Sequence, residues 1–202
     1  MSVLIDLLGA LMIATMLLLM MITFQLQLRD TADRTIFAAQ MMTHVQRACH
    51  DLNGIIALAG IKMPTDSVTV VTADSTVFAF RTFWDFTDNC MTLNANTLSM
   101  ELEADSTSMY APTGFKLNII QSAPILELQS ILWLENLSFS YYDINNVFLG
   151  KQIPDAETRK KIYSVDVNMT FRRDPPDIRA VPLRTRVQLR CHLMNRYLTY
   201  IP

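Results

Sequence analysis

The sequence has no excess of either charge, because 17 Lys and Arg residues nearly balance 19 Asp and Glu residues. It therefore lacks the basic surplus of a dedicated nucleic-acid-binding protein, and we do not expect nucleic acid as a partner. Its three cysteines and three histidines show no C-x-x-C or H-x-x-x-H spacing, which argues against zinc fingers, thioredoxin-like motifs and c-type haem attachment. With no familiar catalytic motif either, we expect no enzymatic activity, no cofactor and no bound metal.

Charge and proline are also missing from the start of the chain. Residues 7–28 contain no charged residue, and no proline precedes Pro64. At about 1.5 Å per residue this apolar run forms a helix of roughly 33 Å, which is enough to cross a bilayer. No basic residue precedes the run and no small-residue cleavage motif follows it, so we do not expect its removal as a secretory signal peptide. We predict an apolar helix, long enough to cross a membrane, over residues 1–28.

Asp6 is the one acidic residue within this apolar helix. A central acid costs roughly 2.5–3.5 kcal/mol on insertion into a membrane, so Asp6 requires a partner or a polar location. Two interpretations remain open: Asp6 lies at the headgroup level or caps the helix near Ser2, or it pairs with the α-amino group of a neighbouring copy. The nearby small residues Gly9, Ala10 and Ala14 either allow helices to approach closely or reflect ordinary membrane-helix composition.

The helix is predicted to continue beyond the apolar run as an amphipathic segment over residues 29–61. Arg29 with Asp33, and Asp30 with Arg34, are opposite charges four residues apart, a spacing that supports one continuous helix. A narrow apolar stripe follows at Phe37, Met41, Val45, Ala48, Leu52, Ile55 and Ala59, and Gln40, His44, Arg47 and Asp51 lie opposite it. A helix from about residue 3 to Gly60 would be roughly 85 Å long, so its first half must extend beyond any domain of this size.

After Pro64 the hydrophobic period changes from 3.6 to 2, which predicts a β-rich globular head over residues 62–202. The clearest alternation covers three strands, at residues 137–141, 163–172 and 181–193, which we expect to be antiparallel. Shorter strands are predicted at 68–72, 77–83, 91–93, 98–102 and 115–120, and loops at 143–146, 150–161 and 173–178. The predicted fold class is α+β, with a long N-terminal helix packed on a mostly antiparallel sheet.

The two parts of the chain carry opposite charge. Residues 1–150 hold 6 basic and 14 acidic residues, whereas residues 151–202 hold 11 basic and 5 acidic ones. These charges could pair within one head or between heads in a head-to-tail array. One basic strip, formed by Arg184, Arg186 and Arg190, is predicted on a single strand face, either solvated or facing another subunit.

The N-terminal pattern SVLIDLLGALMIATMLLLMM, followed by an amphipathic extension onto a β domain, resembles mature type IV pilins and pseudopilins. Within that superfamily the chain is most similar to PilW-type minor pilins and PulJ-type pseudopilins, through ACHDLNGIIALAGIKM, LWLENLSFSYYD, IYSVDVNMTF and RTRVQLRCHLMNRYL. The resemblance implies a pilin-like fold, and a filament whose core is a bundle of apolar helices. It also implies that Asp6, at a position where the family usually has glutamate, neutralises the N-terminal amine of a neighbour. A disulfide between Cys90 and Cys191 would match a link that pilin heads often have.

The resemblance also implies where the chain acts and with what. We expect it in the inner membrane before assembly and then in an extracellular filament at the bacterial cell surface. Its partners would be other copies of itself, the inner-membrane assembly machinery and a prepilin peptidase. Because the basic leader that this peptidase recognises is not among these residues, the chain is expected to be already processed. The alternatives are a minor pilin or secretion pseudopilin at the filament tip, and a monomeric membrane-anchored binding module.

Overall fold

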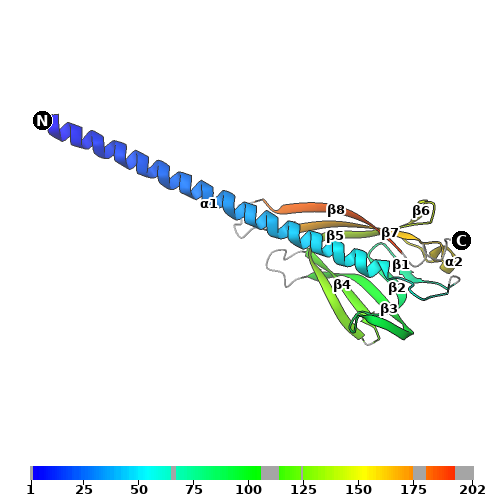
Figure 1. Cartoon of the computed structure of the whole chain (residues 1–202). Helices are drawn as coiled ribbons and strands as arrows, with labels where there is room; N and C mark the ends of the chain where they lie inside the picture. Colours follow the sequence, from blue (N-terminus) through cyan, green and yellow to red (C-terminus); the bar gives the residue numbers. More distant parts are fainter. Residues whose placement is uncertain (1, 65–66, 106–113, 124, 175–180, 194–202) are drawn as a thin grey trace. The chain divides into compact units, whose positions relative to one another are not determined.

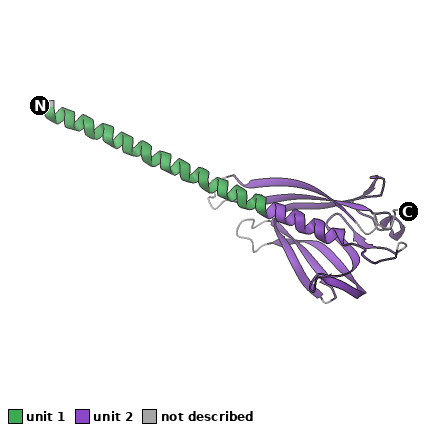
Figure 2. Cartoon of the chain, viewed as in Figure 1, with its two compact units in different colours: residues 1–43 green, residues 44–202 purple. Residues whose placement is uncertain are grey.

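The computed structural model describes residues 2–64, 67–105, 114–123, 125–174 and 181–193. The chain forms two compact units, residues 1–43 and residues 44–202 (Figure 2). The boundary between them lies within the segment 29–61 that we predicted as an amphipathic continuation of the helix. Because the arrangement of the two units is not determined, each is described by itself.

A single helix, α1 (Ser2–Ala57), accounts for the described part of the first unit and continues into the second. Its length follows from a sequence rich in Leu, Met and Ala, which favour helices, and free of proline. The helix ends close to Gly60, as predicted. Gly60 has φ +75°, and a Cβ atom there would lie 2.7 Å from Thr69 Cγ2, so only glycine fits this turn.

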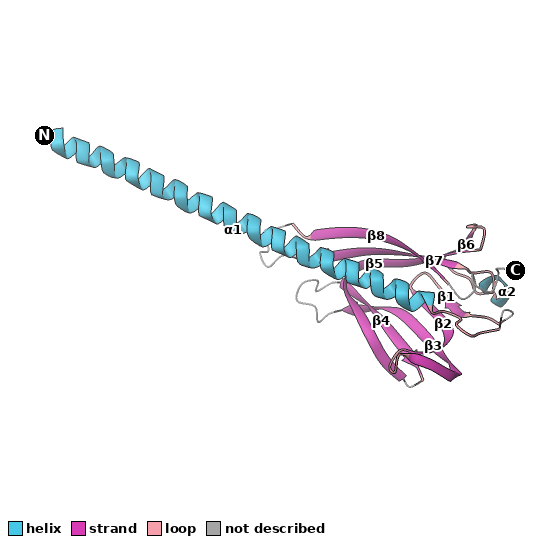
Figure 3. Ribbon diagram, viewed as in Figure 1, coloured by secondary structure: helices cyan, strands magenta, loops and turns pink. Residues whose placement is uncertain are grey.

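The second unit contains an antiparallel sheet with the strand order β1-β2-β3-β4-β5-β7-β8, in which β6 pairs with β5 (Figures 1 and 3). The strands are β1 (Val70–Ala73), β2 (Val77–Asp85), β3 (Cys90–Asp105), β4 (Gly114–Ser122), β5 (Ile125–Tyr142), β6 (Phe148–Gly150), β7 (Ser164–Arg173) and β8 (Leu183–His192). A short helix, α2 (Ala156–Arg159), lies between β6 and β7. The α+β class is therefore confirmed, as are the three clearest strands and their antiparallel pairing.

Strand β5 connects two parts of this sheet. Its first half pairs with β4 and its second half pairs with β7, and the pairing with both neighbours becomes irregular near Leu134. Trp133 has φ +64°, a value that is strained for a bulky residue and marks a sharp bend in the strand. The bend curls the sheet, so that β4 and β7 do not lie in one plane.

The core of the second unit lies between the end of α1 and the sheet. Val45, Ala48, Leu52 and Ile56 are buried on α1, and Phe171 of β7 faces the helix, since it contacts the ring of His44. Alternate residues of β7 point to the same side, and Val165, Val167 and Met169 are fully buried there. The predicted stripe was correct at Val45, Ala48, Leu52 and Ala59, but Ile56 is the buried residue where Ile55 was expected.

Some strands and loops differ from the predictions. Residues 91–93 and 98–102 belong to one strand, β3, and β5 begins twelve residues before the predicted start at 137. Strand β6 was missed, and α2 lies within the predicted loop 150–161, where the Asp155 side chain caps it by accepting from Thr158 N. Residues 175–178 of the predicted loop 173–178 lie outside the described part of the chain.

Candidate functional site

The first unit presents an apolar surface with no cover. Every described side chain from Val3 to Ile36 is exposed, and most residues as far as Leu28 are large and hydrophobic. Within the described chain, α1 is long and apolar enough to cross a membrane, by length and composition. A surface of this kind is not stable in water, so it requires lipid or protein around it.

Asp6 and the small residues near it, which are four of the residues predicted to mediate assembly, lie together on this surface. Asp6, Ala10 and Ala14 follow one another at four-residue spacing, and Gly9 is three residues from Asp6, so all four share one side of α1. At Gly9 a Cβ atom would meet open space. The carboxylate therefore lies beside the smallest side chains of the run, where another helix could come closest.

The two threonine hydroxyls within the apolar run are satisfied by the helix itself. The Thr15 hydroxyl donates to the Met12 carbonyl at 2.8 Å, and the Thr23 hydroxyl donates to Met20 O at 2.9 Å. Threonines bonded in this way can face lipid or another helix at little cost. Asp6 is thus the one group of residues 3–28 whose charge needs an external partner.

A charged band follows the apolar run, and it forms only one of the two predicted ion pairs. Arg34 Nη2 lies 3.1 Å from Asp30 Oδ2, whereas the described residues show no ion pair between Arg29 and Asp33. The difference has a physical reason, because an acid placed four residues before a base agrees with the helix dipole and the reverse order does not. Arg29 and Asp33 keep their charges exposed on the helix surface.

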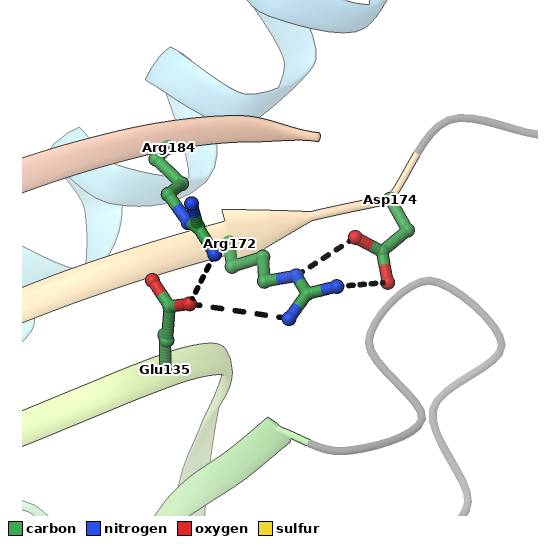
Figure 4. Close-up of polar contacts among 4 residues, drawn as sticks. All are labelled: Glu135, Arg172, Asp174 and Arg184. Carbon is green, nitrogen blue, oxygen red and sulfur yellow. Dashed lines mark hydrogen bonds and ion pairs between the residues drawn. The ribbon is translucent and has the colours of Figure 1, made fainter. Parts of the chain in front are cut away.

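In the second unit, four charged residues form a network across three neighbouring strands (Figure 4). Glu135 of β5 accepts from Arg184 of β8 at 2.7 Å and lies 3.9 Å from Arg172 of β7. Arg172 also donates through Nε and Nη2 to the two oxygens of Asp174. The network contains two acids and two arginines, so its charges balance. Part of the negative charge of residues 1–150 is therefore paired with positive charge of residues 151–202 within one copy.

A second cluster on the same outer face surrounds a buried carboxylate. Asp166 of β7 is 1% exposed and lies directly across from Arg190 of β8. Arg190 donates through Nε to Oδ1 and through Nη2 to Oδ2, the latter at 2.8 Å, and Gln188 donates to Oδ2 at 3.0 Å. The Arg190 guanidinium also stacks on Tyr142, 4.3 Å from the ring centroid. These hydrogen bonds, above all those from Arg190, hold the pKa of Asp166 below its ordinary value.

Replacing Arg190 with leucine is expected to lower the free energy of unfolding by about 3 kcal/mol at pH 7, because Asp166 would stay buried without its cation. Because the pKa of Asp166 is lower in the folded chain than its value of about 3.9 in the unfolded chain, the pair stabilises the fold fully at pH values above about 3.9. This contribution is lost as the pH falls through the pKa that Asp166 has in the folded chain. The difference from the unmodified chain should therefore shrink below about pH 4.

Denaturation of the full chain in detergent, followed by tryptophan fluorescence, measures this effect, since both tryptophans lie in the second unit. Arg186→Leu is the matched control on the same strand, because the described residues give Arg186 no ion pair. Equal losses for the two variants would contradict a specific role for the Asp166–Arg190 pair.

Two polar residues of α1 lie in places that the sequence did not indicate. His44 and Asp51 were expected opposite the apolar stripe, but His44 Nε2 donates to the Leu132 carbonyl at 3.1 Å and Asp51 accepts from Gln129 at 2.7 Å. The expectation failed because the curled sheet reaches the flank of the helix as well as its apolar stripe. Burial lowers the pKa of His44, and two nearby arginines, Arg173 and Arg47, add to this effect against the opposing carbonyl hydrogen bond. We expect His44 to be neutral at pH 7.

The expected disulfide between Cys90 and Cys191 is not formed, and all three cysteines are free thiols. Cys90 is exposed at the start of β3, whereas Cys191 is buried in β8, and three strands separate β3 from β8 in the sheet. Burial raises the pKa of the Cys191 thiol to about 12 and raises that of the Cys49 thiol on α1. Among the described residues no group of three His, Cys, Asp or Glu side chains could hold a metal ion.

Comparison with family models, curated proteins and solved structures finds no match to this chain. A proposal about its function therefore has to be argued from the sequence and from the geometry described above. Sequence reasoning found Asp6 and the arginines of β8, but it missed the Asp166–Arg190 pair. The signal was present, since both residues are polar members of alternating strands that we expected to be antiparallel, but only the strand register places them opposite each other.

Proposed function

We propose that this protein is a structural subunit of a type IV pilus-like extracellular filament, with a pilin-like fold. The observation that carries the proposal is the uncovered apolar surface of residues 3–28, with one carboxylate, Asp6, beside small residues. The sequence resemblance to pilins and pseudopilins supports the same conclusion. The helix would lie in the inner membrane before assembly and in the filament core afterwards, and the heads would lie outside that core.

Transfer between these two environments costs little hydrophobic free energy, because a bundle of apolar helices is about as apolar as lipid tails. Electrostatics then favours the bundle. A carboxylate is costly to keep in lipid, whereas the α-amino group of a neighbouring copy would neutralise it. Asp6 thus gives the assembled state an advantage that an anchored monomer would lack. Assembly would require an inner-membrane machine and a prepilin peptidase, as the resemblance implies.

Electron microscopy and intact-mass measurement of material sheared from producing cells test this proposal. We expect filaments composed mainly of this chain, with a mass that corresponds to a start at or near Met1. Filaments that contain only traces of the chain would favour a minor pilin or secretion pseudopilin at the tip. A chain found only in the membrane fraction, in cells without such filaments, would favour a monomeric anchored binding module and contradict the proposal.

A further inference from the structure

One end of the sheet carries exposed apolar side chains. The β2–β3 and β4–β5 hairpins meet there, since Gln121 at the end of β4 accepts from Phe86 N at 3.0 Å and donates to Asp85 at 3.0 Å. Thr97 N also donates to Ser122 Oγ at 3.0 Å. The exposed apolar residues of this hairpin end are Met91, Leu93, Ile125 and Leu126.

Leu93 lies at the most exposed point of the hairpin end. The pairing of β2 with β3 passes from Thr82 opposite Asn96 to Trp84 opposite Met91, so residues 92–95 bulge out of the ladder. Leu93 is 97% exposed on this bulge, and Ile125 on the neighbouring hairpin is 85% exposed. Together with Met91, Ile125 and Leu126, Leu93 gives the hairpin end a group of exposed apolar side chains, a feature typical of protein–protein contacts.

The hairpin end is acidic. Residues 85–95 and 121–127, which form it, contain three acidic residues, Asp85, Asp88 and Glu127, and no basic one. Asp88 and Glu127 are exposed beside the apolar side chains, and neither has an ion-pair partner among the described residues. An apolar patch with an acidic rim fits a basic partner surface.

A surface of that kind exists on the same chain, at β8. The described residues after 150 include nine basic and four acidic side chains. Arg184, Arg186 and Arg190 are exposed on one face of β8. Arg184 and Arg190 are paired within the unit, whereas Arg186, between them, has no ion pair in the described part of the chain. This β8 strip is therefore left with an uncompensated positive charge.

We propose that the hairpin end of one copy docks on the β8 strip of the next copy, a proposal that rests on the filament function above. The apolar side chains of the hairpin end lie on β3 and β5, whereas the arginines lie on β8, and each surface complements the other rather than itself. A contact between two different surfaces is heterologous, so it repeats from copy to copy and produces an open array. Apolar burial at Leu93 and Ile125 would supply affinity, and the charges would set the orientation.

The exposed thiol of Cys90 lies at the hairpin end and provides a natural probe. In cells producing the Gln188→Cys variant, which places a thiol on the same exposed face of β8 and keeps Arg186, a short bis-maleimide should link Cys90 of one copy to the new thiol of the next. Because every copy carries both thiols, a head-to-tail contact gives a ladder of dimers, trimers and larger products, whereas a closed pair stops at the dimer. The ladder should disappear when Cys90→Ser is added. Lys161→Cys, which places an exposed thiol elsewhere in the basic segment, is the control and should give no ladder.

Adding Leu93→Asp to the Gln188→Cys variant should reduce the ladder about tenfold and leave the unfolding midpoint of the head unchanged. Filaments without the ladder would overturn this inference and leave the filament function standing. A ladder in membranes of cells that make no filaments would support the contact and contradict the filament function. The absence of both the filaments and the ladder would overturn the filament function and the contact. An equal ladder from the Lys161→Cys control would overturn the contact alone.

Discussion

The Asp6→Lys variant is expected to assemble no filaments while the chain still accumulates in the membrane. In the proposed filament, the substitution would replace an attraction to the α-amino group of a neighbour with a repulsion between two cations at the same place. A change of about 3 kcal/mol per contact would weaken each addition of a subunit more than a hundredfold. Membrane insertion should survive, because the remaining residues of the run are apolar and Asp6 lies near the end of the helix.

Sheared filament yield and the amount of chain in the membrane fraction measure this effect together. Asp33→Lys is the matched control, because it makes the same change on the exposed surface of the same helix, at a residue without an ion pair among the described residues. We expect the control to retain most of the filament yield. Normal filaments from Asp6→Lys would show that the carboxylate has no role in assembly, and Asp6 would then be an incidental feature of a membrane anchor.

The Leu52→Ala variant is expected to lose about 2–5 kcal/mol of the free energy of unfolding of the head. Leu52 is 0% exposed on α1 and packs between Ala48 and Ile56 on the buried stripe. Removing three carbons there leaves a cavity and loses apolar burial in a well-packed core. An effect of this size is a large part of the stability of a typical domain, so the variant should unfold at clearly lower denaturant.

Leu18→Ala makes the same chemical change on the same helix but at an exposed residue. In detergent, the tryptophan signal of the head should follow the same denaturation curve in this variant as in the unmodified chain. The comparison separates the two roles of α1, which are packing on the sheet in the second unit and contact with the surroundings in the first. Equal stability of Leu52→Ala and the unmodified chain would mean that the helix does not form part of the head core.

Several elements could be predicted because they depend on local periodicity. A 3.6-residue pattern without proline predicts α1, and the alternation around residues 163–172 predicts β7, whichever partners these segments have. Weaker signals failed where a long-range contact decides the structure. The first half of β5 has no clean alternation, since it bends at Trp133 between two different neighbours, and β6 is only three residues long. Likewise the burial of His44 and Asp51 depends on a curl of the sheet that no local pattern encodes.

By itself the sequence determined that this chain has an apolar helix with a single acid, an amphipathic continuation and an α+β head. These features follow from the order of apolar and polar residues, which sets local periodicity and the preference of each segment for water or for an apolar environment. Only the tertiary structure decided that Arg190 covers Asp166, that Cys191 lacks a disulfide with Cys90, and that Leu93 lies on an exposed bulge. Each of these depends on strand register and on the bend in β5, because register brings together residues that are distant in the sequence.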